Sequence, residues 1–373
     1  MYWTQCLSRL VPRFLSLVLV STVLCLSGCS SEPVEIDSLK VANAKQPSNA
    51  LTFIALDQGY FKAEGLELEF VTFPSGKRAL QEGFLDDKQG FDLVIASDMP
   101  FSSALQNHPD LVTFAHVYSA DNVNSIVARE DENIQDFKDL AGKVIGTQKN
   151  SAVHFFLHQV LTAYDLDNSG IQTLFMPAEV LPAALAEGKI DAFSMREPFV
   201  SQARQLLDGK IKVLKAYGLY HQYELLISTQ SQLAKKHRAV EKFTRALLKA
   251  QNFNYQNPQK AIEIVAKYLE ITPQSILKSW EPGALKVGLQ QGLLVTLENQ
   301  QRWLDPTNAV LLRQEESFLN YFYLPILKTV APEVIAIVYD DSVEVPAGRG
   351  KPSKTTSSPS NLESATPTTA GRL

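Results

Sequence analysis

The chain has 373 residues, a net charge of −5 and a hydrophobic fraction of 45%, which is the composition of an ordinary globular protein. The mild negative charge and the lack of a basic stretch exclude a nucleic-acid-binding surface. Beyond the N-terminal region, no segment approaches the roughly 18 consecutive apolar residues of a transmembrane helix. We therefore expect the body of the chain to fold around its own buried core.

The N-terminal region has the pattern of an export signal. Two arginines precede an apolar run over residues 14–26, as in the basic and hydrophobic regions of a secretory signal peptide. The Leu-Ser-Gly-Cys that ends at Cys29 resembles the bacterial lipobox, which implies cleavage before Cys29 and lipid (palmitate) attachment there. An uncleaved membrane anchor is the alternative. We expect residues 1–28 to be a signal peptide and residues 29–36 a lipid-anchored spacer, with the protein on the periplasmic side of a membrane.

Cysteine is confined to the same region. The only cysteines are Cys6, Cys25 and Cys29. If the signal peptide is cleaved, Cys6 and Cys25 leave with it, so we expect the processed chain to keep only the modified Cys29 and to have no disulfide, although an extracytoplasmic compartment permits disulfides. At the other end, residues 340–373 are rich in Pro, Ser and Thr. Such a composition buries too little apolar surface to offset its ordering entropy, which predicts a disordered tail.

Between residues 39 and 338, short apolar strands alternate with amphipathic helices. The expected strands cover residues 39–42, 66–73, 91–95, 112–117, 125–128, 144–146, 173–176, 192–195, 213–216 and 224–228. The expected helices between them cover residues 49–61, 77–83, 100–106, 151–164, 180–187 and 198–207. This alternation predicts parallel sheets with helices on both faces. After Ser231 the pattern becomes wholly helical and includes a helix over Pro258–Leu269.

These strands are more than one doubly wound sheet of this length usually holds. We therefore expect an α/β fold with two doubly wound lobes and a ligand cleft between them. In open α/β sheets, ligands bind beyond the carboxyl ends of the strands, where helices begin. Polar strand-to-helix turns lie at residues 43–49, 73–76, 96–100 and 147–151. Their free N–H groups and helix dipoles suit an anionic or strongly polar guest, whereas the alternative for each turn is a cap that serves only its own helix.

Four segments, in chain order, resemble the signatures of nitrate/sulfonate/taurine-type solute-binding proteins of ABC importers, a family that includes binders of thiamine pyrimidine precursors. The segments are ALDQGYFKAEGLELE at residues 55–69, FDLVIAS at 91–97, DLAGKVIGT at 139–147, and ALAEGKIDA at 184–192 with Glu197-Pro198-Phe199 after it. The resemblance extends over nearly all of the expected fold.

The resemblance implies a type II periplasmic-binding-protein fold, in which the chain builds one lobe, crosses to the other and returns. We place lobe 1 at residues 37–119 and 224–339, and lobe 2 at residues 120–223. The crossings lie near residues 118–122 and 217–223, where tyrosines suit either a cleft wall or hinge packing. On this interpretation the lobes are hinged and the guest closes the cleft.

The resemblance also implies which residues contact the guest. These are Gln46, Ser48 and Asn49 before the first helix, Ser97 and Asp98 after the third strand, Asn150 and Ser151 before the long lobe-2 helix, and Arg196 with Glu197 in the last segment. The family often has a tryptophan where this chain has Ser194-Met195-Arg196, so sulfonate or nitrate specificity does not transfer directly.

Two of these residues have clear alternatives. Arg196 suits bidentate binding of a carboxylate or sulfonate, or else forms a structural salt bridge. Glu197 suits an amine or a ring donor, or else caps the helix that Pro198 begins. His154 and His158 have metal-ligand spacing on a helix but lack the adjacent glutamate and an obvious third ligand, so we expect no metal there.

The expected function is that of a substrate-binding lipoprotein of an ABC importer, which captures a small polar or anionic organic solute such as a sulfonate, nitrate or taurine. Its partners are the solute, the transporter permease and, through the lipid, the membrane; we expect a monomer with no cofactor. One alternative is a binder of a thiamine-pyrimidine or other heterocyclic vitamin precursor. A remote alternative is a pyrimidine-precursor synthase-like enzyme, but this needs a cysteine-rich iron site, for which the processed chain has no cysteines.

Overall fold

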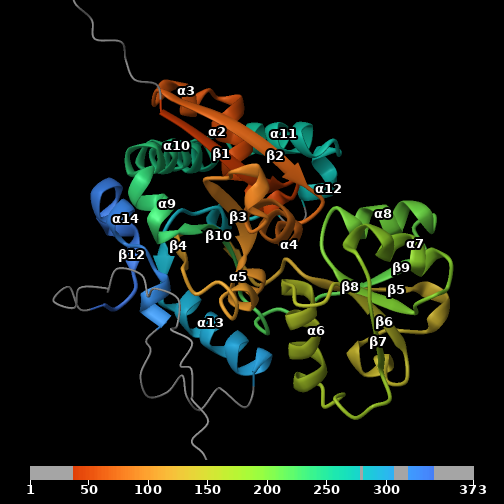
Figure 1. Ribbon diagram of the computed structural model, residues 1–373. Coiled ribbons are helices and arrows are strands. Elements are labelled where there is room, and N and C mark those ends of the chain that lie inside the picture. The colour runs from red at the N-terminus through yellow and green to blue at the C-terminus, as the bar shows by residue number, and fades with distance from the viewer. Residues whose placement is uncertain (1–36, 278–279, 306–317, 340–373) are drawn as a thin grey trace, which may run out of the picture.

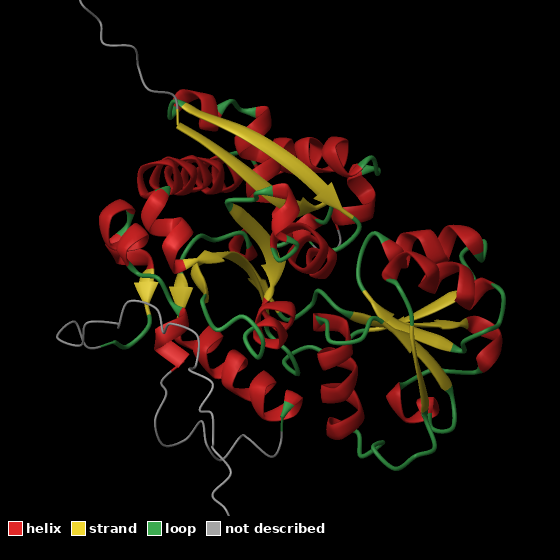
Figure 2. Cartoon of the chain, viewed as in Figure 1, coloured by secondary structure: helices red, strands yellow, loops and turns green. Residues whose placement is uncertain are grey.

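The computed structural model describes residues 37–277, 280–305 and 318–339 (Figure 1). The expected signal peptide, the spacer with Cys29, and the C-terminal tail lie outside these residues. The described chain forms two lobes, each built on its own five-stranded sheet (Figure 2). No helix among the described residues is long and apolar enough to cross a membrane.

The lobe 1 sheet has the strand order β2-β1-β3-β10-β4. Its strands are β1 (Asp37–Ala44), β2 (Leu66–Phe73), β3 (Leu93–Ser97), β4 (Leu111–Ala120) and β10 (Gln222–Thr229). Strand β1 pairs in parallel with β2 and β3, whereas β10 is antiparallel to both β3 and β4.

The lobe 2 sheet has the strand order β7-β6-β8-β5-β9. Its strands are β5 (Ser125–Arg129), β6 (Val144–Thr147), β7 (Gln172–Phe175), β8 (Ala192–Met195) and β9 (Ile211–Leu214). Strand β6 is parallel to β7 and β8, and β5 is antiparallel to β8 and β9.

The prediction of parallel sheets was therefore wrong for one strand in each lobe, β10 and β5. Parallel neighbours need a crossover, usually a helix, that returns the chain to the same sheet edge. Strands β5 and β10 instead follow directly on the two segments that pass between the lobes, 121–124 and 215–221. Without a crossover helix, each enters its new sheet in the opposite direction.

Helices surround both sheets (Figure 1). Those before β10 are α2 (Ala50–Asp57), α3 (Tyr60–Ala63), α4 (Gly76–Arg78) with the π-helical turn η2 (Ala79–Phe84), α5 (Asp98–Ala104), α6 (Ala152–Ala163), α7 (Leu181–Ala186) and α8 (Phe199–Leu206). The expected helix over residues 49–61 is interrupted because Gly59 adopts a left-handed φ of 68°.

The chain after β10 is mainly helical. Its helices are α9 (Gln230–Lys235), α10 (His237–Gln256), α11 (Pro258–Leu269), α12 (Pro273–Leu277), α13 (Gln291–Leu304) and α14 (Pro325–Val330). The parallel pair β11 (Leu289–Gln290) and β12 (Ile335–Ala336) corrects the expectation of a wholly helical segment. Short 3-10 turns are η1 (Pro47–Asn49), η3 (Asp87–Gln89), η4 (Glu130–Glu132), η5 (Phe137–Leu140), η6 (Ala178–Val180), η7 (Pro282–Ala284), η9 (Phe318–Tyr321) and η10 (Pro332–Val334).

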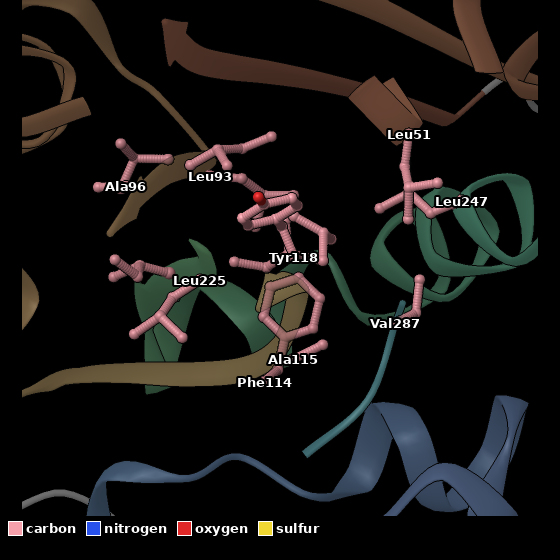
Figure 3. Close-up of a cluster of buried hydrophobic side chains, with 14 of the residues drawn as sticks. Leu51, Leu93, Ala96, Phe114, Ala115, Tyr118, Leu225, Leu247 and Val287 are labelled. Carbon is pink, nitrogen blue, oxygen red and sulfur yellow. The ribbon is translucent and has the colours of Figure 1, made fainter. Parts of the chain in front are cut away.

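The lobe 1 core joins the sheet to the C-terminal helices. Leu93 and Leu225 from the sheet belong to the same buried cluster as Leu51 of α2 and Leu247 of α10 (Figure 3). The apolar positions of α10 recur every three or four residues, so they form one stripe that faces α2 and β1. Burial of this stripe fixes the C-terminal helices against the sheet.

Candidate ligand-binding cleft

A cleft of about 1070 Å³ lies between the lobes. From lobe 1, Gln46 and Ser48 reach it beyond the carboxyl end of β1, and from lobe 2, Arg196 reaches it directly after β8. The carboxyl end of the strands is where open α/β sheets bind ligands. The walls add apolar and aromatic side chains: Pro47, Tyr118, Val200, Val213, Trp280 and Leu285. We call Gln46, Ser48 and Arg196 the polar floor of the cleft.

Arg196 supplies the positive charge of the polar floor. It is only 8% exposed, and among the described residues no carboxylate lies within salt-bridge distance of it. Its guanidinium donates to the side-chain carbonyl oxygens of Gln46 (Nη2 to Oε1, 3.2 Å) and Gln222 (Nη1 to Oε1, 3.5 Å). A guanidinium has five N–H donors. The donors that remain beside the cleft suit an oxyanion, which arginine binds through two parallel hydrogen bonds.

Gln46 connects the two lobes. It has an extended backbone (φ −148°, ψ 151°) immediately before η1. Its amide Nε2 donates to Glu224 Oε1 at 2.6 Å, and its Oε1 accepts from Arg196. Ser48 in turn donates to Glu224 Oε2 at 3.2 Å.

Glu224 is a fully buried carboxyl group of β10 beneath the polar floor. Burial raises its pKa to about 7, because water no longer stabilises the charged form. The positive charge of Arg196 opposes this rise, and the negative charge of Asp98 adds to it. The carboxyl therefore titrates near neutral pH at the back of the cleft.

Asp98 and Ser97 lie at the start of α5, inside lobe 1 rather than in the lining of the cleft. The carboxylate of Asp98 accepts hydrogen bonds from the Tyr220 hydroxyl, the Tyr223 amide (3.0 Å) and the Met99 amide (2.7 Å). Burial raises the pKa of Asp98 to about 6. Asp98 thus holds the second interlobe segment against α5, and Ser97 is buried at the N-cap position of the same helix.

Asn49, Asn150 and Ser151 also lie outside the cleft lining. Asn49 is fully buried and donates to the carbonyl of Ala44 at 2.9 Å, which stabilises the turn after β1. Asn150 has a left-handed φ of 50°. Ser151 donates to the carbonyl of Gln148 at 2.5 Å. Each of the three residues therefore shapes its own turn, Asn49 and Ser151 through the side chain and Asn150 through the backbone.

Glu197 lines the cleft and also caps a helix. Its Oε2 accepts a hydrogen bond from the amide of Ser201 in the first turn of α8 (3.0 Å). This contact satisfies one of the free N–H groups that every helix N-terminus leaves. This hydrogen bond supports the interpretation that Glu197 caps α8.

Sequence reasoning missed several residues around the polar floor. Gln222 and Glu224 lie on the antiparallel strand β10, and Asn124 donates to Gln222 Oε1 at 3.0 Å. Trp280 lies in the loop after α12. The sequence pattern that marks a site is the turn from a parallel strand into a helix, and residues within the antiparallel strand β10 have no such mark.

The two helical histidines are packed among aromatic rings. Trp303 of α13 stacks on His158 (5.5 Å between ring centroids, 27°) and meets His154 edge-on (4.7 Å). Burial lowers the pKa of His154 to about 4. No group of three or more His, Cys, Asp or Glu side chains within the described part of the chain is arranged to hold a metal ion.

Known proteins share both sequence and fold with this chain. A candidate aliphatic sulfonates-binding protein of Bacillus subtilis (strain 168) is 24% identical over 278 residues, which cover 71% of this chain and 82% of the relative. The solved alkanesulfonate-binding protein SsuA of Xanthomonas axonopodis pv. citri, bound to MOPS, has a TM-score of 0.63 at 20% identity and covers 83% of this chain and 100% of its own.

A desulfurization enzyme, DSZB, also resembles this chain. Its structure with biphenyl-2-sulfinic acid has a TM-score of 0.59 at 17% identity, over 80% of this chain and 99% of the enzyme. The α/β fold is that of periplasmic binding proteins, as the family resemblance implied. The family model described as NMT1/THI5 like matches residues 46–261. Since the match extends over more than half of the sequence, the chain belongs to the NMT1/THI5-like family.

Proposed function

We propose that this chain is the substrate-binding component of an ABC importer and that it captures a small organic anion, of the sulfonate class, without transforming it. The observation that carries the proposal is Arg196, a buried guanidinium that faces a cleft and contacts only amide oxygens among its described partners. The sulfonate-binding relative and the alkanesulfonate-binding structure support the same ligand class.

Capture by lobe closure fits the position of Arg196. Strands β4 and β10 move the expected lobe boundaries by one or two residues, so we place lobe 1 at residues 37–120 and 222–339 and the lobe 2 sheet between them, with the interlobe segments 121–124 and 215–221 as hinges. A guest that binds both Gln46 and Arg196 favours the closed state, because only that state offers both contacts. We further propose that lipid at Cys29 holds a monomeric protein at the extracytoplasmic face of a membrane, next to the permease.

The test is calorimetric titration of the chain that begins at Cys29, with Cys29→Ser to avoid lipidation. Alkanesulfonates, nitrate and short carboxylates form the ligand panel. A ligand at one hundred times its Kd also stabilises the fold by about 2.7 kcal/mol, which a thermal shift detects. We expect an alkanesulfonate to bind and Arg196→Gln to weaken binding at least about tenfold, since a hydrogen bond to a charged group contributes about 1.5–3 kcal/mol.

Arg302→Gln is the matched control, because Arg302 lies on the outer side of α13 and pairs with Glu298 at 3.6 Å. Equal weakening by both substitutions, or unchanged binding in Arg196→Gln, would contradict the proposal. Recovery of the bound sulfonate unchanged, checked by mass spectrometry, distinguishes capture from the turnover expected of an enzyme like the desulfurization enzyme.

A heterocyclic vitamin precursor is the second candidate. Trp280 and Tyr118 offer aromatic faces in the cleft wall, and the indole Nε1 of Trp280 is buried without a hydrogen-bond partner among the described residues. Such a wall suits a flat ring. Binding of an aminopyrimidine in the same titrations, with no response to any sulfonate, would favour this candidate.

A further inference from the structure

Glu224 contacts the polar floor from behind and does not itself line the cleft. It is fully buried, and both of its oxygens are occupied by floor residues: Oε1 by the Gln46 amide at 2.6 Å and Oε2 by the Ser48 hydroxyl at 3.2 Å. A guest in the cleft therefore meets Gln46 and Ser48, while Glu224 determines how those two side chains are oriented.

The orientation of the Gln46 amide is fixed from both ends. An ionised carboxylate only accepts hydrogen bonds and a guanidinium only donates them. Glu224 therefore requires the NH₂ group of Gln46, and Arg196 requires its oxygen, as the two contacts show. If the Gln46 amide were flipped, its NH₂ group would face the N–H donors of Arg196 and its oxygen would face the carboxylate of Glu224, and neither pair could form a hydrogen bond.

Ser48 is polarised in the same way. A hydroxyl has one proton to donate and two lone pairs that accept. With its proton directed at the ionised Glu224, Ser48 can only accept a hydrogen bond from a guest. Beside the donors of Arg196, the polar floor thus presents acceptors: the oxygens of Gln46 and Ser48.

We propose that Glu224 is a positioning residue that sets the donor–acceptor polarity of the cleft floor. Its ionised form favours a guest with an N–H donor beside its acidic group, and its protonated form removes that preference. The inference rests on the proposed function, since it assumes an acidic guest at Arg196.

Protonation reverses the polarity through a defined exchange of hydrogen bonds. The carboxylic O–H of protonated Glu224 donates to Ser48, and the Ser48 proton is then free to point at an anionic guest. Protonation of Glu224 also changes the net charge at the polar floor in a way that favours an anion. Arg196 is balanced by ionised Glu224, whereas protonation leaves its positive charge free to attract an anion.

The charges that face Glu224 permit this exchange near neutral pH. Arg196 lies on the lobe 2 side, Asp98 on α5, and the Tyr118 and Tyr220 hydroxyls nearby on β4 and before β10. From α4, the backbone of Gly76 comes so close that an added Cβ would lie 3.4 Å from Oε1. Burial raises the pKa of Glu224 to about 7 against the opposing charge of Arg196.

A pair of matched sulfonates tests the proposal. Propanesulfonate and 3-aminopropanesulfonate differ by one ammonium group, which stays charged across the range used because its pKa is close to the value of about 10.4 for lysine. Calorimetry at about pH 5.5 and about pH 8.5 covers both forms of a carboxyl that titrates near 7. The wild-type chain, Glu224→Gln and the control Glu298→Gln on α13 are compared.

We expect the wild type and Glu298→Gln to prefer the amino compound by about tenfold at the higher pH, since one charged hydrogen bond is worth at least that factor. At the lower pH the preference falls toward one. Glu224→Gln should show a ratio near one at both pH values. A wild-type ratio that is independent of pH, or an unchanged ratio and pH profile in Glu224→Gln, would overturn the proposal.

A ligand-free measurement separates this inference from the proposed function. The side-chain NH₂ resonances of Gln46 in the wild-type chain, assigned by their loss in Gln46→Ala, should titrate with a midpoint between about pH 6 and pH 8. Their failure to titrate there would overturn the positioning role, even in a protein that binds sulfonates. Titration of Gln46 in a protein that binds neither probe would instead reject only the sulfonate function. It would leave the role of Glu224 supported.

Discussion

Arg78 of α4 and Glu179 of η6 form an ion pair across the two lobes, with 2.9 Å between Nη1 and Oε1. Two further contacts lie on the same side: the Lys77 ammonium donates to the carbonyl of Lys149, and Gln148 Nε2 donates to Ser75 Oγ at 3.3 Å. All join the start of α4 to turns of lobe 2. Together with Gln46 and Arg196, these contacts hold the lobes together in this structure.

Loss of the Arg78–Glu179 pair should speed release of a bound ligand. Both side chains are partly exposed, so Glu179→Gln is expected to cost at most about 1 kcal/mol. That corresponds to an increase of up to about fivefold in the dissociation rate, measured by stopped-flow with a competing ligand. The difference from wild type should shrink in high salt, which screens exposed charges.

Glu82→Gln is the control, because Glu82 pairs with Arg78 within the same helical segment and not across the lobes. A faster release in this variant than in Glu179→Gln would show that the interlobe pair does not hold the closed state.

The buried carboxyl of Glu224 should make the fold less stable as pH rises. Its pKa is raised from 4.5 to about 7, so between these values the folded chain binds a proton that the unfolded chain has lost. By linkage, the stabilisation is fully present below about pH 4.5 and is lost as pH rises through about 7, a loss of about 3 kcal/mol. Asp98 acts in the same direction at lower pH.

Urea unfolding at about pH 5 and about pH 8 measures this effect in wild type and Glu224→Gln. The glutamine variant should lose distinctly less stability over the interval, because it has no proton to release there. An equal slope for both chains would show that Glu224 does not titrate in this range. The partly exposed Glu298, changed to Gln, should behave as wild type.

Periodicity and chain order predicted most of the fold. Every strand of the two five-stranded sheets was expected within a few residues of its position, and α11 at its observed bounds. Buried strands such as β3 are continuous apolar runs, and α10 has a single apolar stripe, so both patterns follow from burial. The antiparallel direction of β5 and β10 could not be predicted from these patterns, because an apolar strand has the same local sequence whether its neighbours are parallel or antiparallel.

The candidate site was only partly predictable for a related reason. Gln46, Ser48 and Arg196 lie beyond strand ends, a position that sequence order reveals, and the structure gathers them in one cleft. Glu224 lies within strand β10, where the sequence shows only a single charged residue and no sign of a binding site. Its partners are 176 and 178 residues away in the sequence. Only the assembled fold brings such groups together.

Trp303 should couple the stability of the two lobes. It extends from α13 onto α6, where its ring contacts Phe155 (5.5 Å) as well as the two histidines. Trp303→Ala removes a half-buried ring, so we expect a loss of about 2 kcal/mol, below the cost for a fully buried tryptophan. Urea unfolding should also show a lower m-value as the lobes unfold less cooperatively.

The control for Trp303 is Tyr255→Ala, since Tyr255 is 47% exposed on α10. This substitution should change stability by less than about 0.5 kcal/mol. Equal losses in the two variants, or an unchanged transition in Trp303→Ala, would show that the contact between α13 and α6 adds little.

Glu197 separates a structural role from a binding role at the edge of the cleft. Its carboxylate already accepts the Ser201 amide, so Glu197→Ala should cost about 1 kcal/mol, the usual value of a helix N-terminal acceptor. In thermal unfolding of the ligand-free chain this corresponds to a decrease of about 2–4 °C in Tm. Glu197→Gln keeps an acceptor oxygen and should recover most of that loss.

Sulfonate affinity should stay within about threefold of wild type in both variants, because an oxyanion gains nothing from a carboxylate. An unchanged Tm with binding weakened more than about tenfold would instead assign Glu197 to the guest, through a donor group on it.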